Sequence, residues 1–452
     1  MKVDRTKTPY TFGYLEVPEN RERPTGKTIK LPVYIFKSRS ANPAPDPVLY
    51  TVGGPGSSSL SAAPYMRAFS YLDDRDLILF EQRGTAYAQP SLDCPEWEKA
   101  TTLARQRILS DSAATAILVG AAAGCRDRLQ GQGIDLDAYN TREIAADIED
   151  LRKVLHLDQL NLLTISYSTK IAQTMMRDYP ASIRSVVMDS PLPLAASWDE
   201  SSLSNIMKTY RTIFSDCAAD SLCNNQYPNL GQRFYAFLDA TATSPITLTV
   251  KHPAENRDTT VSITSADIAT YLGDLRTGQV PDFPKTIDAL INGNTEILQQ
   301  QFSWGGSSGT GIGMRLSVWC SEETAYASPV TVAKERAKFS FLNAASPMVF
   351  TYEVCRAWGV RPAPPTEDEP ISSNLPVLLI NGSYDAITPV KWANTLHQQL
   401  PNSRLVIFPG WTHGPTTFWD NNCGMKAAQT FFNNPTNWVT PPCITQITPS
   451  FN

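Results

Sequence analysis

Short apolar segments typical of buried β-strands alternate with amphipathic segments over most of this chain of 452 residues. In residues 142–155, for example, apolar side chains recur every three or four positions, which is the spacing of a helix face. Strands and helices that alternate at short intervals predict a parallel sheet with crossover helices. The predicted strands are 28–36, 47–52, 76–81, 160–165, 183–188, 376–380 and 404–408, and the predicted helices are 113–124, 142–155, 168–179, 389–400 and 425–432.

The middle of the chain breaks this alternation. Residues 196–345 contain amphipathic helix candidates at 203–214 and 231–240, a Thr-rich strand at 246–252 and a Gly/Ser loop at 304–313. The strand and helix alternation returns only near residue 376. We therefore predict an α/β core in two parts, 1–195 and 346–452, with a mainly helical cap inserted at 196–345.

Composition excludes several classes of function. Charged residues make up 18% of the chain and the net charge is −5, so no basic excess is available to bind a nucleic acid backbone. The longest bland apolar stretch, 113–124, is far shorter than the roughly 20 residues that span a bilayer, so no membrane segment is expected. The first residues lack the apolar region of a signal peptide, so any secretion signal would have been removed before this sequence begins.

The segment NLLTISYSTKIAQ carries the strongest chemical signal. A buried strand ends, Ser166 follows, and a helix begins at once, which is the layout of a nucleophile elbow. Such a corner lifts the serine hydroxyl out of the sheet and places helix N–H groups beside developing negative charge. The usual motif has glycines where this chain has Thr164 and Ser168. The alternative is an ordinary Ser/Thr-rich junction between a strand and a helix.

The glycines of VGGPG follow the predicted strand 47–52. Glycines at a strand end allow backbone N–H groups to point into a cavity, as an oxyanion hole requires. In enzymes with this elbow, one donor comes from the early loop and the other from the residue after the nucleophile, here Tyr167. Taken alone, the glycine segment is equally an ordinary turn.

A serine nucleophile needs a base, and the base needs a carboxylate that fixes its tautomer. Only His413 lies in a Gly-flanked loop after a core strand, and Asp385 lies just past the preceding strand. The order Ser166, Asp385, His413 matches the chain order of such triads. Asp189, after the strand at 183–188, is the rival acid. The other histidines lie at a helix end, in a polar loop or among polar helix residues, where no catalytic role is indicated; they are His156, His252 and His397.

These segments resemble the α/β-hydrolase serine peptidases that include proline iminopeptidases and secreted bacterial tripeptidyl aminopeptidases. The matching text includes GGPGSSS, FEQRGTAYAQPSLDCP, NLLTISYSTKIAQ, CAADSLC and LLINGSYDAITP. The resemblance implies an α/β-hydrolase fold, a mostly parallel sheet with flanking helices and a cap. It also implies a Ser166, Asp385 and His413 triad with Gly54 and Tyr167 as oxyanion donors.

The chain departs from that family at the borders of the expected site. Thr164 and Ser168 replace the elbow glycines, and Glu81, Ala86 and Ala88 stand in a segment that commonly reads D-Q-R-G-T-G-x-S. The elbow replacements either reshape the pocket floor or are simply tolerated. We expect these changes to leave the fold intact, but they leave the identity of the substrate undetermined.

Enzymes that trim peptides from the N-terminus need an anion for the substrate ammonium group, which otherwise loses hydration without a partner. Glu322 and Glu323, in WCSEE, are the candidates because they lie in the cap beside a cysteine. The alternative is that both glutamates start a solvated helix.

The eight cysteines form no C-x-x-C pair and no Cys/His cluster, so no metal site or other cofactor is expected. Sequence proximity suggests the pairs Cys217–Cys223 and Cys423–Cys443, and the family resemblance supports Cys94–Cys125 and Cys320–Cys355. Disulfide bonds imply an oxidising compartment, hence a secreted or periplasmic protein. The alternative is eight reduced thiols in a cytosolic enzyme.

The resemblance favours a serine exopeptidase that cleaves short peptides or residues from peptide N-termini through an acyl-enzyme. An esterase or amidase acting on small molecules with the same triad is the second hypothesis, and a binding protein with a decayed elbow is the third. Expected partners are a peptide or a small-molecule ester or amide, without nucleic acid or membrane.

Overall fold

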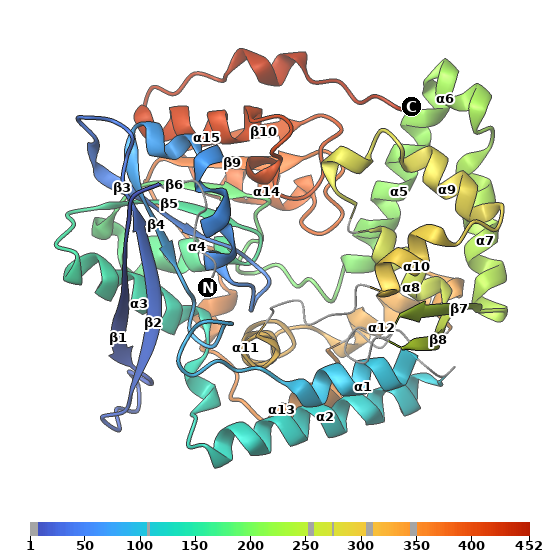
Figure 1. Cartoon of the computed structure of the whole chain (residues 1–452), viewed down its shortest axis with the longest axis horizontal. Coiled ribbons are helices and arrows are strands. Elements are labelled where there is room, and N and C mark those ends of the chain that lie inside the picture. The colour runs from blue at the N-terminus through green and yellow to red at the C-terminus, as the bar shows by residue number, and fades with distance from the viewer. Residues whose placement is uncertain (1–7, 106–108, 252–256, 274, 304–310, 344–349) are drawn as a thin grey trace.

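The computed structural model describes residues 8–105, 109–251, 257–273, 275–303, 311–343 and 350–452. Its centre is an eight-stranded sheet with the strand order β1-β2-β4-β3-β5-β6-β9-β10 (Figure 1). The six strands from β4 to β10 run parallel, whereas β1 and β2 pair antiparallel with their neighbours. The strands are β1 Tyr10–Pro18, β2 Thr28–Phe36, β3 Ala44–Thr51, β4 Arg75–Phe80, β5 Leu160–Ile165, β6 Ile183–Asp189, β9 Val377–Gly382 and β10 Ser403–Phe408.

Both faces of the sheet are covered, so its central strands are buried throughout. Leu162 of β5 packs into one hydrophobic cluster with residues of α3 and α4, whereas its neighbour Leu163 packs into a second cluster with residues of α15. Successive residues of a strand point to opposite faces, which is why these strands read as continuous apolar runs. The covering helices are α3 Thr141–Val154, α4 Ser168–Asp178, α14 Val390–Gln399 and α15 Cys423–Asn433.

Every strand predicted for the core is present, and the predicted helices 142–155, 168–179, 389–400 and 425–432 correspond to α3, α4, α14 and α15. The edge strand β1 was not predicted. Its aromatic residues Tyr10, Phe12 and Tyr14 are each more than 40% exposed, whereas its buried residues are Leu15 and Val17. The apolar positions therefore change face within the strand, which breaks the alternation that marks a half-buried strand.

The inserted segment is mainly helical and has its own hydrophobic cluster, in which Phe214, Phe234 and Phe283 pack together. Its predicted end at residue 345 lies outside the described residues, as does most of the Gly/Ser loop 304–313. The elements are α5 Ser202–Ala219, α6 Ser221–Gln226, α7 Leu230–Thr243, β7 Ile246–Lys251, β8 Asp258–Ile263, α8 Ser265–Leu272, α9 Phe283–Ile291, α10 Glu296–Ser303, α11 Ile312–Val318 and α12 Pro329–Ala337.

The last part of the insertion packs with the core. Met314 and Leu316 of α11 belong to the hydrophobic cluster of the sheet, not to that of the other inserted helices. Beneath α11 lies a layer of three helices (Figure 1), and the Trp358 indole N–H donates to Ser317 Oγ at 3.0 Å to join this layer to α11. The three helices are α1 Pro95–Arg105, α2 Asp111–Gly131 and α13 Tyr352–Trp358.

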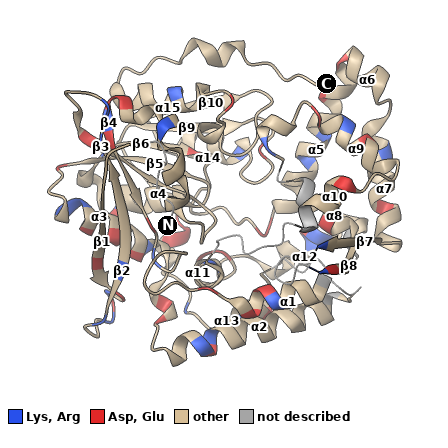
Figure 2. Cartoon of the chain, in the orientation of Figure 1, with Lys and Arg blue, Asp and Glu red and all other residues tan. Residues whose placement is uncertain are grey.

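Basic and acidic residues are interspersed over the helices and strands of both parts (Figure 2). Within the described residues, no helix combines the length and the apolar character needed to cross a membrane.

Candidate active site

Ser166 lies on the sharp corner between β5 and α4. Its φ of 60° is in the left-handed region, which a residue other than glycine adopts at a cost of about 1 kcal/mol or more. The backbone N–H of Ser166 donates to the carbonyl of Asp189 at 2.9 Å, which fixes this conformation to the end of β6. The corner therefore has the geometry of the predicted nucleophile elbow.

The two residues that replace the usual glycines are buried beneath this corner. The Ser168 hydroxyl accepts from the N–H of Ile165 at 2.8 Å and donates to the carbonyl of Thr51 at 2.8 Å. The Thr164 hydroxyl donates to the carbonyl of Val187 at 3.1 Å. Both hydroxyls thus have backbone partners inside the sheet, and both side chains are fully enclosed, so the elbow accommodates them without an unpaired polar group.

The glycine loop that follows β3 lies directly against the corner. A Cβ on Gly53 would be 2.7 Å from the Ser166 Cβ, and Gly54 has a φ of 117°, so both positions require glycine. Among the described residues, no hydrogen-bond acceptor pairs with the N–H groups of Gly54 or Tyr167. The Gln82 side chain supports the start of this loop by donating to the carbonyl of Val52 at 2.7 Å.

Asp385 and His413 form a pair. The Nδ1 atom of His413 lies 2.9 Å from one Asp385 carboxylate oxygen and 3.1 Å from the other. The carboxylate also accepts from the N–H groups of Ile387 and Thr388 and from the Thr388 hydroxyl, at 2.8–2.9 Å. Asn381 donates to it at 3.2 Å. Asp385 is therefore buried with its orientation fixed, while the His413 side chain remains partly exposed.

Asp189, the rival acid, has a different set of partners. Its buried carboxylate accepts from the N–H and the hydroxyl of Thr416, and burial raises its pKa to about 6. The next residue, Ser190, accepts the N–H of Gly414 on its hydroxyl at 2.9 Å. Residues 189 and 190 thus hold both the serine corner and the loop that contains His413.

The remaining histidines have no such surroundings. His397 Nδ1 lies 2.7 Å from the Ser403 hydroxyl near the end of α14, and His156 follows the end of α3. His252 lies outside the described residues.

Glu322 and Glu323 lie in the π-helical turn η6, Trp319–Glu323, and both are buried. Glu322 accepts from the N–H and the hydroxyl of Thr141, whose hydroxyl also contacts the Tyr167 phenol at 2.8 Å. Burial raises the pKa of Glu322 to about 7. Glu323 forms an ion pair with the buried Lys170 of α4. The alternative prediction, a solvated helix start, is wrong because both carboxylates are enclosed.

Glu322 also borders a cavity of about 340 Å³ between the start of α3 and the Pro-rich segment 361–370. Ser166, Asp385 and His413 do not line this cavity. It is therefore separate from the candidate catalytic residues.

Sequence reasoning missed the residues that position the candidate site. Asn381, Thr388, Ser190 and Thr416 all act through hydrogen bonds within or between loops. Thr388, three residues after Asp385 and directly before a proline, is the one for which short spacing offered a signal, since Thr side chains favour local turns. The Asp189 to Thr416 contact joins residues 227 positions apart, so no spacing pattern predicts it.

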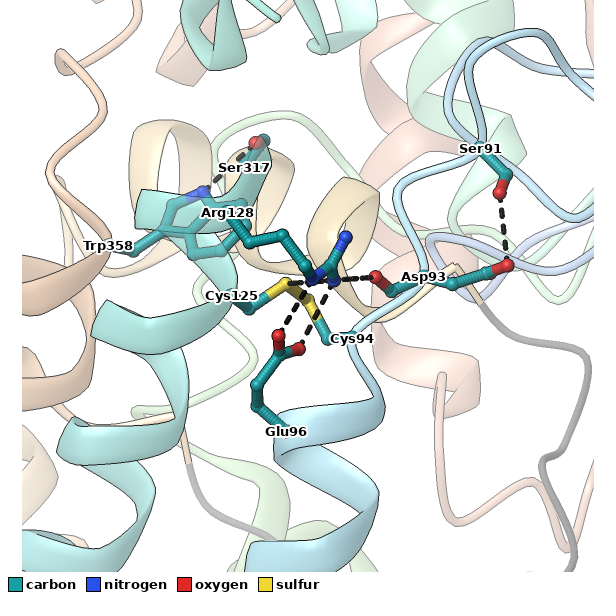
Figure 3. The surroundings of a disulfide bond; sticks show 8 residues. All are labelled: Ser91, Asp93, Cys94, Glu96, Cys125, Arg128, Ser317 and Trp358. Carbon is teal, nitrogen blue, oxygen red and sulfur yellow. Dashed lines mark hydrogen bonds and ion pairs between the residues drawn. A yellow bond between two sulfur atoms is a disulfide. The ribbon is translucent and has the colours of Figure 1, made fainter. Parts of the chain in front are cut away.

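The cysteines form four disulfide bonds with the pairings expected from the sequence, namely Cys94–Cys125, Cys217–Cys223, Cys320–Cys355 and Cys423–Cys443. Cys94, Cys125 and Glu96 are close enough together to suggest a metal site within the described residues. Figure 3 shows that the two sulfur atoms are joined and that Arg128 binds the Glu96 carboxylate, with Nε to Oε1 at 2.7 Å. This group therefore has no free ligand atoms of the kind a metal needs.

Comparisons with known proteins agree with this geometry. The model of the alpha/beta hydrolase fold family matches residues 46–225, and that of the TAP-like protein family matches residues 343–439. Serine protease Hip1 of Mycobacterium tuberculosis is 24% identical, with 91% of this chain and 82% of that protein covered. Tripeptidyl aminopeptidase of Streptomyces lividans is also 24% identical, with 88% and 76% covered.

A solved structure of proline iminopeptidase from Mycobacterium smegmatis covers 94% of this chain and 99% of its own, at 13% identity and a TM-score of 0.41. The first family model matches the N-terminal part of the core and the start of the insertion, the second matches the C-terminal part of the core, and the sheet order and the serine corner agree with them. The chain is therefore a hydrolase of the α/β-hydrolase fold, and its sequence is similar to those of serine protease Hip1 and tripeptidyl aminopeptidase.

Proposed function

We propose that the chain is a serine exopeptidase that removes a residue or a short peptide from the N-terminus of its substrates. The observation that carries this proposal is the Asp385–His413 pair, because Asp189 bonds both to the loop that follows His413 and to the Ser166 corner. A serine hydroxyl, an imidazole and a buried carboxylate in this chain order have the roles of nucleophile, base and orienting acid.

In the proposed reaction, His413 takes the proton of Ser166 while the serine oxygen attacks the substrate carbonyl. The N–H groups of Gly54 and Tyr167 donate to the oxyanion, and Asp385 holds the imidazole tautomer and stabilises the imidazolium. The imidazolium then protonates the leaving amine, and water hydrolyses the acyl-enzyme by the reverse proton transfers. The two N–H groups have no acceptor among the described residues, which supports this role for them.

Glu322 and Glu323 are the proposed site for the substrate ammonium group. Glu323 supports this most directly, because its partner Lys170 lies in the first turn of α4, which begins just after the Ser166 corner. An enclosed carboxylate binds an ammonium group strongly only while it is ionised. We also propose that the protein works in an oxidising compartment, because its eight cysteines pair as four disulfides.

A serine-directed fluorophosphonate and a panel of chromogenic peptide amides test the proposal. We expect the wild-type protein to be labelled, and Ser166→Ala to lose labelling and roughly 10⁶-fold in kcat. A labelled Ser166→Ala protein, or one with full turnover, contradicts the assignment.

The exopeptidase part has its own test. Peptide amides with a free N-terminus should be cleaved, whereas the same peptides with an acetylated N-terminus should not, and Glu323→Gln should raise KM for the free peptides only. Hydrolysis of short acyl esters with no cleavage of any peptide amide would instead assign the same triad to an esterase.

A further inference from the structure

Arg315 lies on α11, and the residue just before this helix contacts the glycine loop. The N–H of Gly311, just before α11, donates to the carbonyl of Gly56 at 2.8 Å, and a Cβ on Gly311 would be 2.6 Å from the carbonyl oxygen of Gly84. Arg315 is one helical turn further along, since its N–H donates to the carbonyl of Gly311. Arg315 is therefore one helical turn from the residue that contacts the glycine loop.

The guanidinium of Arg315 is enclosed by aromatic rings and lacks an anionic partner. It lies 5.6 Å from the centre of the Trp319 ring and 5.4 Å from that of Phe350. Its Nε is buried without an acceptor, and within the described chain no hydrogen bond or ion pair reaches the guanidinium. Burial lowers the pKa of Arg315 to about 10, which reflects the cost of enclosing a cation without a contacting anion.

Asp199 is the acid that acts on Arg315 electrostatically, yet it does not pair with it. The Asp199 carboxylate accepts from the Trp319 indole N–H at 3.0 Å and forms no ion pair with the described cations. Burial and the nearby Glu323 charge raise the pKa of Asp199 to about 7, so near neutral pH it is only partly ionised. It is therefore an incomplete counter-ion for Arg315.

We propose that Arg315 is the binding residue for a carboxylate carried by the acyl part of the substrate. A guanidinium presents two N–H groups in a fork that matches a carboxylate, and the residue keeps some accessible surface while its Nε is buried. A carboxylate bound at the accessible part of the guanidinium would neutralise the enclosed charge.

For a peptide, the substrate class is one with an Asp or Glu side chain in the N-terminal piece that is released. This choice of peptide rests on the proposed exopeptidase function. The subsite itself would also accept an ester with a terminal carboxylate, because the recognised group is the same. Testing both peptides and such an ester therefore distinguishes an incorrect subsite from an incorrect exopeptidase assignment.

The experiment measures kcat/KM on matched substrate pairs. Tripeptide p-nitroanilides carry Glu or Gln at the first, second or third residue with Ala elsewhere, and p-nitrophenyl hemiglutarate is compared with p-nitrophenyl hexanoate. We expect wild-type protein to prefer the carboxylate member of at least one pair by about 10- to 100-fold, the range of one charge-assisted contact. Arg315→Gln should abolish this preference while hydrolysing the neutral member within about threefold of wild type, and Arg315→Lys should retain part of the preference.

Arg356→Gln is the matched control, because that arginine is 77% exposed on α13 and should leave every ratio unchanged. Cleavage of the peptides without any preference for Glu, or a preference that survives Arg315→Gln, overturns the subsite and leaves the exopeptidase proposal standing. A preference seen only for the hemiglutarate ester, with no peptide cleaved, supports the subsite and overturns the exopeptidase.

Discussion

The two buried aspartates of the candidate site, Asp385 and Asp189, have different hydrogen-bond partners. Asp385 orients His413 and is itself oriented by donors from Ile387 and Thr388. Asp189 binds the N–H and hydroxyl of Thr416, and its carbonyl accepts the N–H of Ser166. One carboxylate therefore contacts the proposed base directly, whereas the other fixes the backbone on which base and nucleophile are carried.

This difference predicts unequal effects of two isosteric substitutions. Asp385→Asn should lower kcat by about 10⁴-fold, because an amide favours the wrong imidazole tautomer. Asp189→Asn should lower kcat only about tenfold, because an amide oxygen still accepts from Thr416 and no contact with His413 Nδ1 is lost. Steady-state rates on one chromogenic substrate check this, with circular dichroism as a control for folding. A nearly silent Asp385→Asn would make Asp189 the acid.

At the scale of elements, the strands and helices that build the core follow from apolar runs and helical spacing, because both faces of the sheet are buried. The corner at Ser166 and the loops that contain Asp385 and His413 were also predictable, since each follows a core strand. The exposed edge strand β1 and the π-helical turn η6 lack such a pattern. In η6, the enclosed environment of Glu322 depends on packing against the start of α3, which only the folded chain brings together.

The burial of Glu322 predicts a pH-dependent stability. Because its pKa rises from 4.5 to about 7 on folding, the folded state binds this proton more tightly than the unfolded state. The stabilisation from the neutral carboxyl is therefore full below the unfolded pKa and is lost as pH rises through the folded pKa. Glu322→Gln stays neutral, so its free energy of unfolding relative to wild type should increase from about pH 4 to pH 8, by up to about 3 kcal/mol.

Urea unfolding of both proteins at several pH values measures this difference. Lys426→Gln is a matched surface control, since Lys426 is exposed on α15 and forms no ion pair among the described residues, and its difference from wild type should vary little over the same range. A Glu322→Gln difference that is flat with pH, or that falls as pH rises, contradicts the prediction.

At the scale of the whole molecule, the inserted segment contacts both loops that carry the proposed acid and base. Tyr384 and Ala386, on either side of Asp385, pack into the hydrophobic cluster of the inserted helices. The N–H of Thr412, just before His413, donates to the hydroxyl of Thr277 in the short turn η5, Thr277–Gln279, at 3.0 Å. The C-terminal segment adds a further link, because the N–H of Asn452 donates to the carbonyl of Pro281. These contacts fix the loops of the proposed acid and base against the inserted segment.

The contact between Thr277 and Thr412 makes this positioning testable. Thr277→Val removes the acceptor and leaves the buried N–H of Thr412 unpaired, which costs about 1–3 kcal/mol and shifts the loop that carries His413. We expect kcat to fall about tenfold or more, because base geometry matters most in the transition state, with KM little changed. Thr277→Ser keeps the hydroxyl and should restore wild-type kcat. Equal kcat values for the Val and Ser variants would mean that the hydrogen bond from Thr412 to Thr277 does not position the proposed base.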